Sequence, residues 1–145
     1  MKFIRCSYFF MLFFLGMLAI FVSISTAGEV IIIVNESIPV DSLNKDEVKN
    51  IYLGNITEWE DKKKIEVLVL KDTQLHELFL KTYVKRNASQ FKNVWKRNLF
   101  TGKGNTPKEF ESIEKLLTYI SMTKGTIGYV PTGTPISDNI KVVAQ

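Results

Sequence analysis

Glycines and lysines lie close together in the stretch Leu99–Phe110, LFTGKGNTPKEF, and this composition could hold a phosphate group. A nucleotide P-loop, however, places Ser or Thr directly after its Gly-Lys pair. Here Gly102-Lys103 is followed by Gly104, and the stretch follows an expected helix instead of a strand. The stretch is therefore either a flexible turn between two helices, or a turn that also holds an anion through Lys103 and the backbone amides of the following helix.

The other reactive residues of the chain do not indicate an enzyme. His76 is the only histidine, and the only cysteine, Cys6, lies in the N-terminal segment, so neither a metal site nor a nucleophilic triad can be assembled around them. The carboxylates Glu109 and Glu111 lie in charged sequence and not in the apolar surroundings that acid–base catalysis needs. We therefore expect a protein that is not an enzyme, with no metal and no cofactor.

The first 27 residues have the three parts of a secretory signal peptide. Lys2 and Arg5 precede an apolar run from Tyr8 to Val22, and small residues end the segment at Ala27. The apolar run is shorter than the ~20 residues that span a bilayer, so we expect cleavage near Ala27 and not a retained anchor. This predicts a domain of residues 28–145 in the periplasm of a bacterium or secreted from it, with no stable membrane anchor after cleavage and no cysteine.

Basic residues gather in the second half of the chain, where residues 78–108 contain no Asp or Glu. The bases are Lys81, Lys85, Arg86, Lys92, Lys96, Arg97, Lys103 and Lys108. They form either solvated helix faces or a positive surface for an anion, an acidic partner or lipid headgroups. The net charge of the whole chain is only +4 and no nucleic-acid motif appears, so we do not expect nucleic acid as a partner.

Alternating strand and helix patterns predict the elements that would position these residues. The expected strands cover 30–34, 65–70, 126–130 and 140–144. The expected helices begin after the potential N-cap residues Asn44, Thr73, Ser89 and Thr106, the last helix with a break near Ser112. Asn44 with Glu47, and Thr106 with Glu109, have the spacing of capping boxes. The alternation predicts a single α/β domain with helices on the faces of the sheet.

Three segments, in this order, resemble the second lobe of the phosphate-binding subunits of phosphate ABC importers. They are KNIYLGNITEWED at 49–61, LFTGKGNTPKEF at 99–110 and KGTIGYV at 124–130. The resemblance covers most of residues 42–130. It implies one lobe of a type 2 periplasmic-binding-protein fold, with a central mixed sheet of about four or five strands and helices on both faces. It also implies solute binding, with inorganic phosphate or a related oxyanion as the ligand.

The resemblance also implies candidate ligand-binding residues. In that family the loop after the second strand supplies an arginine and a Ser-Gly-Thr run at a helix start, and the matching place here reads Lys71-Asp72-Thr73-Gln74. Lys71, Thr73 and Gln74 are therefore the implied ligand-binding residues, and Lys103 with its neighbouring amides is the second choice. Lysine supplies a point charge, whereas an arginine supplies a bidentate fork.

Two functions stay open at this stage, because that family binds phosphate between two lobes and this chain has residues for one. In the first, the exported chain binds phosphate or a similar oxyanion weakly or as part of an assembly, with a partner protein or a homodimer supplying the second lobe. In the second, the chain has no ligand and binds a protein partner, through the edge that would face the missing lobe or through the basic surface between Lys81 and Lys108.

Overall fold

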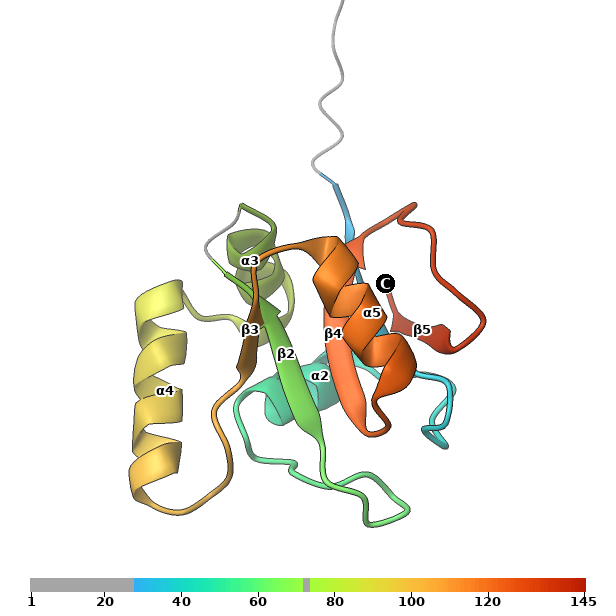
Figure 1. The fold of residues 1–145 in the computed structure, drawn as a ribbon. Coiled ribbons are helices and arrows are strands. Elements are labelled where there is room, and N and C mark those ends of the chain that lie inside the picture. The colour runs from blue at the N-terminus through green and yellow to red at the C-terminus, as the bar shows by residue number, and fades with distance from the viewer. Residues whose placement is uncertain (1–27, 72–73) are drawn as a thin grey trace, which may run out of the picture.

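The computed structural model describes residues 28–71 and 74–145, which form one mixed five-stranded sheet with helices around it (Figure 1). The strands are β1 Val30–Asn35, β2 Glu66–Leu70, β3 Lys108–Phe110, β4 Thr126–Pro131 and β5 Ile140–Ala144. Their order across the sheet is β3-β2-β4-β1-β5. β2 runs parallel to β3 and β4, whereas β1 runs antiparallel to β4 and β5. The predicted mixed sheet is confirmed.

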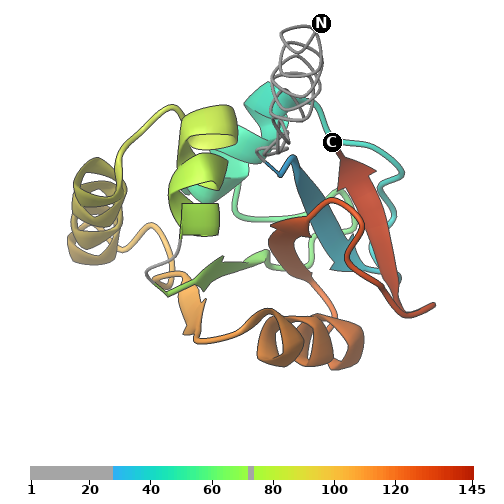
Figure 2. The ribbon, with the colours of Figure 1, turned by 90° about the horizontal axis from the view of Figure 1, so that it is seen from above.

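Helices cover both faces of this sheet, as predicted. They are α2 Lys45–Tyr52, α3 Gln74–Phe79, α4 Ala88–Phe100 and α5 Ile113–Met122, and the π-helical segment η1 Leu80–Val84 continues α3. Viewed from above, α2 and α3 lie on one face of the sheet and α5 lies on the other (Figure 2). α4 stands at the outer side of the molecule, beyond β3 (Figures 1 and 2).

Two consecutive residues of β4 show how one strand packs against both layers of helices. Gly128 lies under α5, where an added Cβ would come 2.8 Å from Cδ1 of Ile120 and 3.1 Å from Cδ2 of Leu116. The next side chain, Tyr129, points to the opposite face and stacks on Phe79, with 4.0 Å between the ring centroids. Side chains alternate along a strand, so β4 supplies a gap for α5 and an aromatic ring for α3.

The buried apolar side chains form a single cluster that extends from Val30 to Val143. All six residues of β1 are buried, as expected for a strand that is covered on both faces. The stretch 28–145 therefore contains a continuous core of its own. The expected signal peptide and Thr73 lie outside the described residues.

The predicted helix after Thr106 is wrong, and its capping box with Glu109 does not form. Residues 108–110 extend instead into β3, which pairs in parallel with β2 in the register Leu68↔Lys108 to Leu70↔Phe110. This pairing satisfies backbone groups of β2 that a helix would leave without partners. The helix begins only at Ile113, where the Ser112 hydroxyl caps it by accepting from the Lys115 N–H.

The predicted cap of α4 at Ser89 is also wrong. The helix begins at Ala88, and its N-cap is Asn87, which forms a capping box with Gln90 through hydrogen bonds of 2.9 and 3.1 Å. The predicted capping box of α2 is confirmed, because Asn44 and Glu47 exchange hydrogen bonds of 2.9 and 2.7 Å. Both boxes follow the same rule, in which a side-chain oxygen satisfies an orphan backbone donor of the first turn.

Candidate functional site

The carboxyl ends of β2 and β3 meet at one edge of the sheet, because the two strands run in parallel. From this edge the chain continues from β2 into α3 on one face, and from β3 into α5 on the other face (Figure 2). Open α/β sheets place their ligands in the crevice outside such a switch point. The carboxyl edge, defined here by Lys71, Gln74 and Ser112, is therefore the first candidate site.

Backbone hydrogen bonding fixes the position of Lys71 at this edge. Its N–H donates to the carbonyl of Phe110 at 2.8 Å, which ties the end of β2 to the end of β3. The side chains of Lys71 and Gln74 are both exposed. Ser112, the N-cap of α5, places the N-terminus of that helix at the same edge, and the backbone amides of a helix N-terminus attract anions. The exposed ion pair of Glu111 with Lys115, 3.2 Å long, lies beside them.

A buried hydroxyl supports the start of α3 from below. β2 and β4 pair only at Glu66↔Thr126 and Val67↔Ile127. Further along, the hydroxyl of Tyr129 replaces a backbone partner by accepting from the Leu70 N–H at 2.9 Å, and it lies 2.6 Å from Nδ1 of His76. Burial raises the pKa of Tyr129, so this hydroxyl stays protonated at neutral pH.

His76, which is partly buried, is thus part of a structural network. Its ring lies 6.1 Å from that of Tyr129 in a stacked arrangement and 5.9 Å from that of Phe91 edge-on. Because His76 comes two residues after Gln74, the network holds the beginning of α3 against the sheet. The contact of His76 with Tyr129 could not be predicted from the sequence, since 53 residues separate the two and no spacing rule links them.

The second-choice residue, Lys103, does not lie at the carboxyl edge. It precedes β3, whereas Lys71 follows β2, and the two parallel strands put these positions at opposite ends of the sheet. The interpretation that Lys103 acts with the amides of a following helix is wrong, because the turn after α4 leads into a strand. The structure therefore places Lys71 and Gln74 together and Lys103 apart from them.

Lys103 lines a cavity of about 330 Å³ between α4 and the loop that follows α2. The lining residues are Leu53, Asn55, Arg86, Val94, Arg97, Asn98, Thr101 and Lys103. We call this the Arg86 cavity. It has three cationic side chains and no acidic one. None of the ion pairs among residues 28–71 and 74–145 involves these three cations.

Close packing around Gly54 fixes one wall of the Arg86 cavity. Gly54 has φ +73°, and an added Cβ would come 2.7 Å from Nδ2 of Asn98 and 3.2 Å from the ring of Trp95. Asn98 donates to the Leu53 carbonyl at 2.9 Å, and Trp95 donates to the Tyr52 carbonyl at 2.9 Å. These contacts attach α4 to the end of α2, and the positive φ of Gly54 is the left-handed conformation in which helices commonly end.

Residues 28–71 and 74–145 contain neither a cluster of metal ligands nor a membrane-spanning helix. No group of three or more His, Cys, Asp or Glu side chains there could hold a metal ion. Nor does any helix in that part have the length and apolar character needed to cross a membrane.

Comparison with known proteins places this arrangement in a wider context. A family model described as a PBP superfamily domain matches residues 25–145. Among curated protein sequences no match was found.

Three solved structures share the fold. An ABC-type phosphate transport receptor from Vibrio cholerae has a TM-score of 0.64 and 19% identity over 80% of this chain and 45% of its own. A structure from Clostridium perfringens is described as a phosphate ABC transporter substrate-binding protein with bound phosphate. It has a TM-score of 0.64 and 18% identity over 80% of this chain and 44% of its own. PstS from Borrelia burgdorferi has a TM-score of 0.63 and 13% identity over 81% of this chain and 47% of its own. The chain therefore spans less than half the length of each of these proteins.

Proposed function

The chain belongs to the family of PBP superfamily domains, and from that premise we propose that it is a solute-binding lobe for phosphate or a related oxyanion. The solved structures of similar fold include one described as a phosphate transport receptor and one described as a phosphate ABC transporter substrate-binding protein with bound phosphate. A role in binding and not in catalysis, outside the cytoplasm after export, is part of the same proposal. The expected signal peptide supports the export.

One observation carries the proposal, namely the switch point at the carboxyl edge. Lys71 is held there by its hydrogen bond to Phe110, and the N-terminal amides of α5 open on the same side. A positive side chain together with the amides of a helix N-terminus favours an anion. We assign Lys71, Gln74 and the neighbouring Thr73 to this site, with the amides after Ser112 as additional donors.

The proposed site has protein on one side only, so we expect weak binding by the isolated chain. A carboxylate, Glu111, lies at the same edge, and Lys71 supplies one charge without the fork of an arginine. A closed cleft would exclude water from the ion and would strengthen each of these interactions. A second copy of this chain or a partner protein could supply the opposite wall.

Thermal unfolding of residues 28–145 with phosphate, with sulfate and without either anion tests the proposal. A ligand at ~100 times its Kd adds ~2.7 kcal/mol to the free energy of unfolding. For a domain of this size each kcal/mol raises the midpoint by ~4 °C or more. We expect a rise that is specific to phosphate and that Lys71→Ala removes. Lys124→Ala is the matched control, because Lys124 is exposed and precedes β4 at the opposite end of the sheet.

An unchanged midpoint at millimolar phosphate would overturn this function. It would favour the alternative in which the chain binds a protein partner through the edge that would face a second lobe. A rise that Lys71→Ala leaves intact would keep phosphate as the ligand but move the site away from the carboxyl edge.

A further inference from the structure

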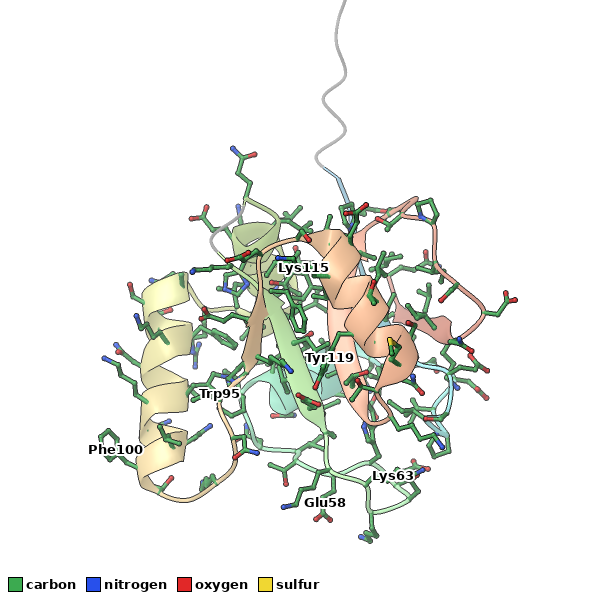
Figure 3. All side chains as sticks on the ribbon, in the orientation of Figure 1. Glu58, Lys63, Trp95, Phe100, Lys115 and Tyr119 are labelled. Carbon is green, nitrogen blue, oxygen red and sulfur yellow. The ribbon has the colours of Figure 1, made fainter. Side chains whose placement is uncertain are left out.

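Two large apolar side chains are exposed side by side at the end of α4. Phe100 is 89% exposed and Leu99 is 56% exposed. Figure 3 shows Phe100 pointing away from the body of the protein, whereas Trp95 of the same helix points toward it. Single exposed apolar residues are common. A pair at the tip of a helix that stands at the outer side of the molecule suggests contact with something apolar.

Cationic side chains surround this apolar tip. Lys96 and Arg97 precede Phe100 by four and three residues, so they lie next to it on the helix surface. Lys92 lies one turn further back, and α4 contains no acidic residue. None of these cations takes part in an ion pair of the described residues. The end of α4 is therefore both apolar and positively charged.

The Arg86 cavity extends along α4, from Arg86 before the first residue of the helix to Lys103 after its last. Arg97 lines the cavity and precedes Phe100 by one turn, while Thr101 and Lys103 line it from the residues that follow. A neighbouring cavity of about 420 Å³ shares Arg86, Val94 and Arg97 with it. Guanidinium groups match the oxygens of a phosphate ester bidentately, so the cavity suits a phosphate-bearing headgroup.

The three features together favour one kind of partner. A free anion would account for the cavity but not for the exposed pair. Aromatic and aliphatic side chains flanked by lysine and arginine are typical of surfaces that lie in the interface of an anionic bilayer. The outer position of α4 leaves it free to approach a flat surface (Figures 1 and 2).

We propose that the end of α4 docks peripherally on a bilayer containing anionic phospholipids. Phe100 and Leu99 enter the interfacial region, and the Arg86 cavity receives a headgroup phosphate. This docking is independent of the oxyanion site at the carboxyl edge, which lies at the other end of the sheet. It requires no membrane-spanning segment.

Sedimentation of residues 28–145 with lipid vesicles tests the docking. One set contains equal parts of phosphatidylcholine and phosphatidylglycerol, and the other contains phosphatidylcholine alone. We expect binding to the first set, with little binding to the second and a decrease on addition of salt. Phe100→Ser should weaken binding by about ten-fold, because a buried apolar side chain is lost. Arg97→Gln with Lys103→Gln should weaken it by roughly five-fold per charge.

A matched control is available on another helix. Met122 of α5 is 80% exposed, so Met122→Ser removes a similarly exposed apolar side chain far from the basic residues of α4. It should leave vesicle binding unchanged. None of these variants changes the carboxyl edge, so each should keep the rise in the unfolding midpoint that phosphate causes. The two proposals can therefore fail separately.

The proposal is overturned if the protein does not bind the anionic vesicles, or if Phe100→Ser binds them as tightly as the unmodified protein does. Binding to soluble polyglutamate in place of vesicles would also overturn it, and it would assign the basic surface to an acidic protein partner. If inorganic phosphate alone occupies the Arg86 cavity and Phe100→Ser has no effect, the cavity is a site for a free anion.

Discussion

The hydroxyl of Tyr129 lies 2.6 Å from Nδ1 of His76 and also accepts a hydrogen bond from the Leu70 backbone. Strand β4, the end of β2 and the start of α3 are thereby joined through one oxygen atom. The network lies directly below the carboxyl edge, so it determines where Lys71 and Gln74 are held. β4 pairs with β2 through its backbone only at the beginning of the two strands. At the end of β2, the Tyr129 side chain takes the place of a backbone partner.

Removing this hydroxyl should destabilise the protein while the aromatic packing is kept. Tyr129→Phe leaves the buried Leu70 N–H without its partner, which costs ~1–3 kcal/mol of the free energy of unfolding. Urea unfolding measures the loss. Tyr119→Phe is the control, because its hydroxyl bonds the partly buried Glu66 carboxylate and not a buried backbone group. Equal losses in both variants would contradict the special role of the Tyr129 hydroxyl.

The same residue predicts a loss of stability at high pH. Burial raises the pKa of Tyr129 above the ordinary value of 10.0. In the unfolded chain the phenol therefore loses its proton first, and deprotonation favours unfolding. The stabilising contribution is complete below pH ~10 and decreases as the pH rises above that value.

The pH dependence of the urea midpoint in the unmodified protein and in Tyr129→Phe tests this effect. Burial also raises the pKa of Tyr52, and Tyr129 raises it further, so the variant reduces the contribution of Tyr52 in the same direction. We expect a shallower decrease in the variant. Parallel curves through alkaline pH would show that Tyr129 does not titrate differently in the two states.

A pair of glycine substitutions separates backbone strain from close packing. Gly54 and Gly102 have φ values of +73° and +69°, so alanine is strained at both. Only at Gly54 would the new Cβ meet Asn98 and Trp95, since nothing lies within 4 Å of it at Gly102. We expect Gly54→Ala to be the more destabilising by ~1–3 kcal/mol, as overpacking in a core is. Similar midpoints in thermal unfolding would contradict the fixed contact between α2 and α4.

An arginine in place of Lys71 should strengthen the proposed oxyanion site. A guanidinium can donate two parallel hydrogen bonds to phosphate, whereas the ammonium acts as a point charge. Isothermal titration of Lys71→Arg with phosphate should give a lower Kd than that of the unmodified protein. Lys124→Arg, at the opposite end of the sheet, should not. A Kd that is the same in Lys71→Arg as in the unmodified protein would argue against contact between residue 71 and the ion.

Much of the fold could be predicted from sequence because its signals are local. The run VIIIV predicted β1, and Asn44 with Glu47 predicted the start of α2, since both depend on neighbouring residues only. β3 was missed because it is a three-residue edge strand whose stability comes from pairing with β2. The Thr106-Pro107 pattern satisfied the local rule for a helix, but the nonlocal pairing prevailed.

The candidate sites, too, could be predicted from the sequence only where they depend on neighbouring residues. The basic run of residues 78–108 was visible in the sequence, yet its clustering of Arg86, Arg97 and Lys103 around a cavity depends on how α4 packs against the end of α2. The exposure of Phe100, in contrast, agrees with the helical period, because Phe100 lies off the stripe of Phe91, Trp95 and Asn98 that α4 buries.

The central claim is that the carboxyl edge holds an oxyanion, and the most direct measurement is the change in backbone amide NMR shifts of residues 28–145 on titration with phosphate. The account predicts saturable changes at Lys71, Gln74 and the first turn of α5 after Ser112, with smaller changes on addition of sulfate. Changes confined to Arg86, Arg97 and Lys103, or no saturable change at any residue, would contradict it.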